Sequence, residues 1–157
     1  MRCPWMRPFR SASGLRLAID SFLIADGVNK VAFAHFTLAT KDVDRSRNFF
    51  AAALGWQPID RPVDIPMKAA WLQIAPGQEL HLVEVDDFEA SKHEREYGRH
   101  LALAYPKIDF SALKLRLVAH GAELIAPQRD TPFERFFFKD PNGYLFEVID
   151  VDPDPGS

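Results

Sequence analysis

The chain lacks the cysteines that a disulfide framework or a cysteine-ligated zinc site requires. Its only cysteine is Cys3, near the start of a 157-residue sequence. A single thiol excludes an internal disulfide and agrees with a reducing compartment. Since 157 residues are enough to bury a sizeable core, we expect one cytoplasmic domain that is stabilised by apolar packing.

A surplus of basic residues and a long apolar run are absent as well. The chain has 19 Lys and Arg against 22 Asp and Glu, which gives a formal net charge of -3. Nucleic-acid binding needs clustered Lys and Arg, so we expect no nucleic-acid partner. No apolar run approaches the ~20 residues of a membrane-spanning helix, so we expect no membrane partner. The sequence also lacks a glycine-rich phosphate loop.

The two ends differ in composition from the middle. Residues 1–30 hold four arginines and no acid before Asp20, which faintly resembles a targeting peptide. The apolar run "SFLIA" is short, however, and no small-residue cleavage site follows it. We therefore expect residues 1–30 to be a loosely ordered N-terminal extension and residues 151–157 to be a tail, with a single domain at residues 31–150.

Within residues 31–150, hydrophobic periodicity predicts a strand, a helix and then further strands. "VAFAHFTLAT" alternates as a strand does, and "KDVDRSRNFFAAALGW" has a helical apolar stripe. Asp42 is placed to cap the start of this helix and Gly55 to end it in a left-handed conformation. Two strands, "AAWLQIA" and "ELHLVEV", follow around a Pro-Gly turn.

The second half repeats this order. "HLALAYP" predicts a strand, and the next segment predicts a helix that starts at Asp109 and ends at Gly121. "AELIAP", "FERFFFKD" and "YLFEVID" predict three strands, the last two joined by a turn at residues 140–143.

Landmarks of the first half recur in the second at a nearly constant offset. The offset is 65 residues from His35 to His100, and it is 66 from Gly55 to Gly121, from Gly77 to Gly143 and from His81 to Glu147. A constant offset indicates a duplicated unit. We therefore predict an α+β fold of two tandem βαβββ modules, residues 31–85 and 99–150, joined by a polar linker at residues 86–98. The modules should form a curved mixed sheet around a central pocket, with the helices outside.

Four polar side chains occupy matching places in the two modules: His35, His81, His100 and Glu147. Each lies in a predicted strand, and alternation places it on the face opposite the large apolar neighbours. An ionised glutamate between Phe146 and Val148 needs a partner. Imidazole nitrogens and a carboxylate suit a divalent Zn, Ni, Co, Mn or Fe ion, so these four residues form the predicted metal site.

The sequence resembles the vicinal oxygen chelate superfamily, which is also called the glyoxalase/bleomycin resistance/dioxygenase superfamily. The resemblance covers about residues 31 to 150, and the most specific stretches are "AHFTLATKDVDRSRNFFAAALGW" and "RFFFKDPNGYLFEVID". It implies metal ligands on the first and last strands of each module, at His35, His81, His100 and Glu147. It also favours a homodimer.

The resemblance implies a metal-dependent enzyme of the glyoxalase I or epimerase kind, a lyase or an isomerase. One divalent ion would chelate neighbouring oxygens of a small oxygen-rich substrate and stabilise an enolate, with Glu147 or His81 moving the proton. The first alternative is an Fe(II) extradiol dioxygenase, in which His81 is an acid or base rather than a ligand. The second is a non-catalytic small-molecule binding protein.

Several other residues could have a structural role rather than a functional one. We expect His93 to be a solvated linker residue and His120 to end a helix. Trp71 suits either the pocket or the core. Arg135 suits either an anionic substrate or a cross-strand contact.

Overall fold

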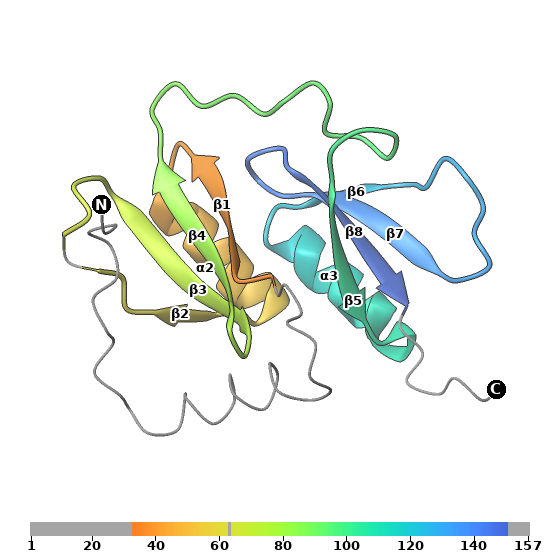
Figure 1. The fold of residues 1–157 in the computed structure, drawn as a ribbon. Helices are drawn as coiled ribbons and strands as arrows, with labels where there is room; N and C mark the ends of the chain where they lie inside the picture. The colour runs from red at the N-terminus through yellow and green to blue at the C-terminus, as the bar shows by residue number, and fades with distance from the viewer. Residues whose placement is uncertain (1–32, 63, 151–157) are drawn as a thin grey trace, which may run out of the picture.

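The computed structural model describes residues 33–62 and 64–150, so the expectations for residues 1–30 and 151–157 lie outside the described residues. Each half of the chain forms a four-stranded sheet with one long helix (Figure 1). The first module consists of β1 (His35–Thr40), α2 (Val43–Leu54), β2 (Gln57–Ile59), β3 (Ala69–Ala75) and β4 (Gln78–Glu84). The second consists of β5 (Leu101–Tyr105), the 3-10 turn η1 (Lys107–Asp109), α3 (Phe110–Ala119), β6 (Glu123–Ile125), β7 (Arg135–Lys139) and β8 (Leu145–Asp150).

The two modules have the same topology. The strand orders are β1-β4-β3-β2 and β5-β8-β7-β6. In each sheet the first strand pairs with the last in parallel, and the other pairings are antiparallel. The predicted α+β class and the paired βαβββ modules are therefore confirmed, and hydrogen bonding groups the eight strands into two sheets of four.

Local sequence signals explain where α2 begins and ends. The side chain of Asp42 accepts a hydrogen bond from the backbone N–H of Arg45, which satisfies one free donor of the first turn. Gly55 has φ 76°, and its N–H reaches the carbonyls of Phe50 and Ala51. A side chain would be strained in this left-handed conformation, so glycine suits the position.

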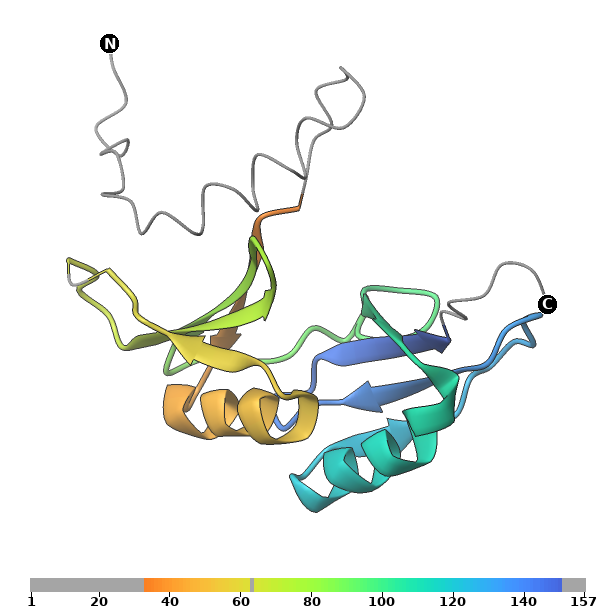
Figure 2. The same cartoon turned by 90° about the horizontal axis from the view of Figure 1, so that it is seen from below.

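Each helix covers one face of its sheet, as Figure 2 shows from below. Strand alternation sends Leu38, Leu72, Leu80 and Leu82 of the first module, and Phe136, Phe138, Phe146 and Val148 of the second, into one continuous core. The intervening residues of each strand face the other way. His35, His81 and Glu147 are among these, so they lie on the sheet faces turned away from the helices, and His100, just before β5, contacts Glu147 there.

Aromatic packing joins the modules into one body. The ring of Phe50 on α2 stacks on Trp56 with centroids 5.2 Å apart, and it meets Phe146 of β8 edge-on at 5.8 Å. Trp56 belongs to the first module and Phe146 to the second. Burying Phe50 therefore stabilises both modules at once.

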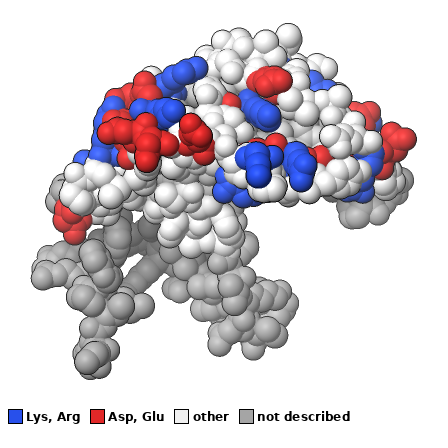
Figure 3. All heavy atoms as spheres, turned by 90° about the horizontal axis from the view of Figure 1, so that it is seen from above, with Lys and Arg blue, Asp and Glu red and all other residues white. Residues whose placement is uncertain are grey.

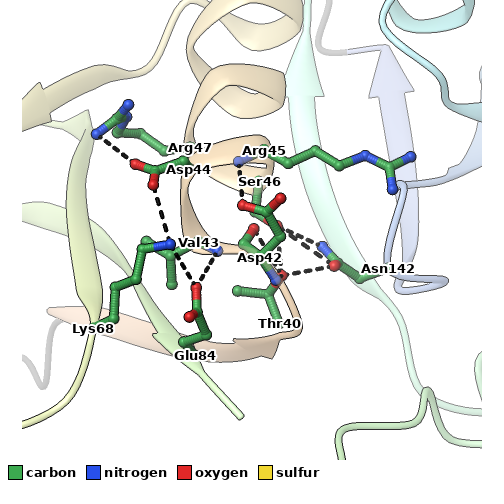
Figure 4. Close-up of polar contacts among 10 residues, drawn as sticks. All are labelled: Thr40, Asp42, Val43, Asp44, Arg45, Ser46, Arg47, Lys68, Glu84 and Asn142. Carbon is green, nitrogen blue, oxygen red and sulfur yellow. Dashed lines mark hydrogen bonds and ion pairs between the residues drawn. The ribbon is translucent and has the colours of Figure 1, made fainter. Parts of the chain in front are cut away.

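A buried polar cluster lies at the same junction (Figure 4). The hydroxyl of Thr40 lies 2.7 Å from that of Ser46 and 2.8 Å from the side-chain oxygen of Asn142. Asn142 also donates to the Ser46 hydroxyl at 3.0 Å. Since Thr40 and Ser46 are almost fully buried, these bonds fix the turn before β8 against the start of α2.

The outer surface near this junction carries charges of both signs. Lys68 bridges Asp44 and Glu84 at 3.1 and 3.0 Å (Figure 4). On the face that Figure 3 shows, Lys and Arg are interspersed with Asp and Glu rather than gathered into one patch. Within the part of the chain that the structure describes, no helix is long and apolar enough to cross a membrane.

Two details differ from the sequence prediction. β2, the short strand Gln57–Ile59, completes the βαβββ pattern predicted for the first module, but its residues were not assigned from the sequence, because three residues containing a proline give no alternation to detect. His100 directly precedes β5 instead of lying within it.

Candidate functional site

His35 and His81 lie together on the open face of the first sheet. β1 and β4 are parallel neighbours, and their register sets His81 beside Thr37, two residues along from His35. The two imidazole rings stack with centroids 4.2 Å apart and an angle of 14° between their planes. Trp71 of β3 packs on the other side, 4.4 Å from His81.

This stacking limits how the two histidines can bind a metal. The lone pair of an imidazole nitrogen lies in the plane of its ring, so the ion must lie close to that plane. Two nearly parallel, stacked rings cannot both meet this condition for one ion. In the observed arrangement, therefore, at most one of His35 and His81 can be a ligand of any single ion.

His81 has a carboxylate partner of its own. Its Nε2 lies 2.9 Å from Oε2 of Glu79, which is two residues earlier on the same strand. A carboxylate in this position fixes the orientation of the imidazole ring.

His100 and Glu147 form a second pair on the face of the second sheet that is turned away from α3. Glu147 of β8 lies between Ala102 of β5 and Phe137 of β7, and it is 7% exposed. Nε2 of His100 lies 3.4 Å from Oε2 of Glu147. The other ring nitrogen, Nδ1, is buried and has no hydrogen-bond partner.

The chemistry and spacing of this pair fit a bound divalent ion. A distance of 3.4 Å is long for a charge-assisted hydrogen bond. Two ligands of one ion, each about 2.1 Å from it, lie about 3.4 Å apart at a tetrahedral angle. The imidazole and the carboxylate are therefore already spaced as two ligands of one ion.

Glu147 also has a partner within the protein, which is Arg135 of β7. Nη1 of Arg135 donates to Oε1 of Glu147 at 2.7 Å. This bond leaves Oε2 facing His100. The buried carboxylate is thus balanced by a guanidinium from the neighbouring strand, so the cross-strand interpretation of Arg135 is correct.

The second terminal nitrogen of Arg135 binds a carboxylate of the linker, Glu96. Glu96 also accepts a hydrogen bond from the backbone N–H of Gln128 and lies 3.6 Å from Nε of Arg129. The side chains of Arg135 and Glu96 are 3% and 6% exposed. Two carboxylates therefore share one buried guanidinium.

The pKa shifts agree with this charge arrangement. Burial alone would lower the pKa of Arg135, but its hydrogen bonds to Glu147 and Glu96 raise that pKa above its ordinary value. Burial alone would raise the pKa of Glu96, but the Gln128 N–H and the Arg135 guanidinium lower that pKa below its ordinary value. Both groups are therefore ionised at neutral pH.

Glu96 was not among the predicted site residues, because it lies in a charged segment, "KHEREYGR", that is typical of a solvated linker. His93 and Arg95 are indeed exposed, but Glu94 and Glu96 turn inward. Glu94 binds Arg99 and accepts a hydrogen bond from the backbone N–H of Leu145 at 2.8 Å. In the sequence, the alternation of Glu94 and Glu96 with Arg95 is the feature that could have indicated two inward-facing carboxylates.

The structure thus assembles the four predicted ligands as two separate pairs. Among the described residues, no group of three or more His, Cys, Asp and Glu side chains is placed to hold one metal ion. His100 lines a cavity of about 190 Å³ between β1 and the second module, together with Thr37 and Tyr144. A larger cavity, of about 620 Å³, lies beside α2 and the exposed His120, away from both pairs.

The paired βαβββ modules define the fold of the vicinal oxygen chelate proteins. The model of the Glyoxalase/Bleomycin resistance protein/Dioxygenase superfamily matches residues 32–148. The chain belongs to this superfamily, as the sequence motifs predicted.

Relatives and solved structures agree with this assignment. Glyoxylase I 4 of Arabidopsis thaliana is 24% identical over 125 residues, which cover 77% of this chain and 71% of that protein. The fosfomycin resistance protein FosX of Listeria monocytogenes is 21% identical with a TM-score of 0.62, over 80% of this chain and 94% of that one. A glyoxylase/bleomycin resistance protein/dioxygenase domain from Frankia sp. EAN1pec is 22% identical with a TM-score of 0.64, over 78% and 99% of the two chains.

Structural likeness at such identities shows the fold alone. One structure of a FosX mutant from Listeria monocytogenes, with a TM-score of 0.63 and 20% identity over 79% and 93% of the two chains, contains Mn(II) and 1S,2S-dihydroxypropylphosphonic acid.

Proposed function

We propose that the protein is a metal-dependent enzyme of the glyoxalase I or epimerase type, a lyase or isomerase that acts on a small oxygen-rich substrate. The observation that carries this proposal is the His100–Glu147 pair, whose facing atoms are 3.4 Å apart on the face of the second sheet that is turned away from α3. The similarity to a plant glyoxylase I supports it. The divalent ion would be Zn, Ni, Co, Mn or Fe.

His100 and Glu147 would hold this ion, with His35 as the third protein ligand. Two imidazoles and one carboxylate leave coordination positions open for substrate oxygens. When bound, the ion supplies Lewis-acid polarisation of those oxygens. Arg135 keeps one oxygen of Glu147 occupied and thereby fixes the orientation of the other.

His81 then serves as the acid or base that moves a substrate proton. It stacks on the predicted ligand His35, and its contact with Glu79 orients the ring. A histidine beside a proposed metal ligand, held in place by a carboxylate, would be arranged for proton transfer. The stacking argues against the other role predicted for His81, that of a simultaneous fourth ligand.

The site would be completed by a second copy of the chain. Within the described residues of one chain, His35 does not form a three-donor cluster with His100 and Glu147. In a two-fold symmetric homodimer, His35 of each copy would meet the His100–Glu147 pair of the other. The symmetry gives two equivalent sites.

A second candidate function is small-molecule binding without a metal. The Arg135–Glu147 ion pair favours it, because the guanidinium already balances the buried carboxylate. In that case the sheet faces would bind a ligand without reaction, as the bleomycin-resistance alternative predicts.

Elemental analysis of protein purified without chelators separates these functions. The proposal predicts close to one divalent ion per chain and sharply lower occupancy in Glu147→Gln. A metal-free wild-type protein would favour the binding function. Iron as the bound metal would favour the dioxygenase alternative, and zinc, nickel or cobalt would favour lyase or isomerase chemistry.

A further inference from the structure

The linker between the modules places the carboxylate of Glu96 against the second sheet. There it binds Arg135, which also binds the proposed metal ligand Glu147. Glu96 is 6% exposed, although its neighbours Arg95 and Tyr97 are exposed. Its partners come from two elements: the loop that holds Gln128 and Arg129, and strand β7 with Arg135. Burying a carboxylate without such partners is costly. The linker therefore does more than connect the two modules, since it also supplies a buried charge to the second one.

Glu96 determines how Arg135 can bind Glu147. A guanidinium presents parallel N–H groups and readily binds both oxygens of one carboxylate. Here Nη1 binds Oε1 of Glu147, whereas Nη2 is held by Glu96 and by the carbonyl of Arg129 at 3.0 Å. Since Nη2 is occupied, Oε2 of Glu147 stays free to face His100.

We infer that Glu96 is a positioning residue of the metal site, which acts through Arg135 to keep one oxygen of Glu147 available as a ligand. This inference rests on the proposed metal-dependent function. Without the Glu96 carboxylate, Nη2 of Arg135 can turn to Oε2 of Glu147 and compete with the ion. The positive charge of Arg135 would also be less balanced, which disfavours a second cation nearby.

The test is the metal dissociation constant of the full-length chain after removal of metal, measured by titration calorimetry with Zn²⁺ or Mn²⁺. The variant is Glu96→Gln, which keeps the shape of the side chain and removes its charge. We expect binding weaker by roughly tenfold or more, the range seen for residues that support metal ligands.

Glu94→Gln is the matched control. Glu94 is also a buried linker carboxylate, but it binds Arg99 and the Leu145 N–H rather than Arg135. We expect its dissociation constant to stay within about threefold of the wild type, since the wild-type Arg135–Glu147 contact is retained. Equal losses in Glu94→Gln and Glu96→Gln would mean that linker docking alone matters, and would overturn the inference.

A double-mutant cycle identifies Arg135 as the intermediary. In an Arg135→Met background, adding Glu96→Gln should no longer weaken metal binding, because the competing guanidinium is gone. An undiminished effect in that background would contradict the mechanism. If Glu96→Gln does not fold, Glu96→Asp replaces it, and its dissociation constant should lie between those expected for wild type and Glu96→Gln.

The possible failures are distinguishable. A wild-type chain that binds neither ion overturns the proposed function and this inference with it. A wild-type chain that binds metal, with a Glu96→Gln variant that binds it equally well, overturns the inference alone.

Discussion

The imidazole rings of His35 and His81 stack with their centroids 4.2 Å apart, although the two residues are 46 positions apart in the sequence. Because stacked rings cannot both direct a lone pair at one ion, the two histidines should have different roles. We expect His35→Ala to lose bound metal and His81→Ala to keep it while losing turnover. Elemental analysis of both variants checks this. Loss of metal from His81→Ala with retention in His35→Ala would reverse the assignment.

A mixing experiment addresses whether two chains form each site. His35→Ala and Glu147→Gln should each bind little metal alone. If each site combines His35 of one copy with Glu147 of the other, a mixed dimer contains one intact site and one doubly altered site. We therefore expect metal binding to reappear when the two variants are unfolded, mixed and refolded together. If dimers shown to contain both variants do not recover metal binding, the ligands of each site come from one chain. A monomeric mass by light scattering would exclude the homodimer altogether.

Phe50 should be one of the most sensitive core positions, since its ring contacts Trp56 in one module and Phe146 in the other. Phe50→Ala should lower the free energy of unfolding by about 3–5 kcal/mol, through lost burial and the cavity left behind. Urea denaturation measures this. Leu115→Ala is the control, because Leu115 is 75% exposed on α3 and its loss should change stability by less than about 0.5 kcal/mol.

Asp140 should give the protein a specific pH dependence. Burial raises the pKa of this carboxyl above its ordinary value, although hydrogen bonds from Asn142 and Tyr144 oppose the shift. A carboxyl with a higher pKa in the folded state than in the unfolded state binds protons more tightly when folded. Its contribution to stability is therefore complete at pH below the ordinary value and is lost as pH rises through the folded-state pKa.

We therefore expect the unfolding free energy of the wild type, relative to Asp140→Asn, to decrease as pH rises from about 4. Urea denaturation at a series of pH values checks this direction. Asp109→Asn is the control, because Asp109 is exposed and makes no side-chain cap bond. The expectation would be contradicted if the unfolding free energy of the wild type minus that of Asp140→Asn stayed constant or rose with pH.

The sequence was sufficient to predict the elements whose signals are local. Asp42 and Gly55 cap α2 as expected, and α3 lies within the predicted span from Asp109 to Gly121. The recurring offset predicted that both modules share one topology, because duplicated sequence patterns specify duplicated folds.

The contacts around Glu147 were beyond sequence reasoning, because they depend on where distant segments meet. Arg135 is twelve residues before Glu147 and becomes its neighbour only through the β7–β8 pairing. Glu96 reaches Arg135 across 39 residues, from a segment with no periodicity. The stacking of His35 on His81 likewise follows from the parallel register of β1 and β4, which the sequence alone does not specify.

The packing of Phe50 against Phe146 also indicates whether the two duplicated halves can fold independently of each other. Sequence repetition suggests two units that once could have folded independently, but the core now runs through both. Thr40 and Ser46, both buried, find polar partners in Asn142 of the other half. Separating the halves would expose this aromatic surface and leave those hydroxyls without their partner. We therefore expect the two modules to unfold as a single cooperative unit, so that a destabilising change in one module lowers the stability of the other.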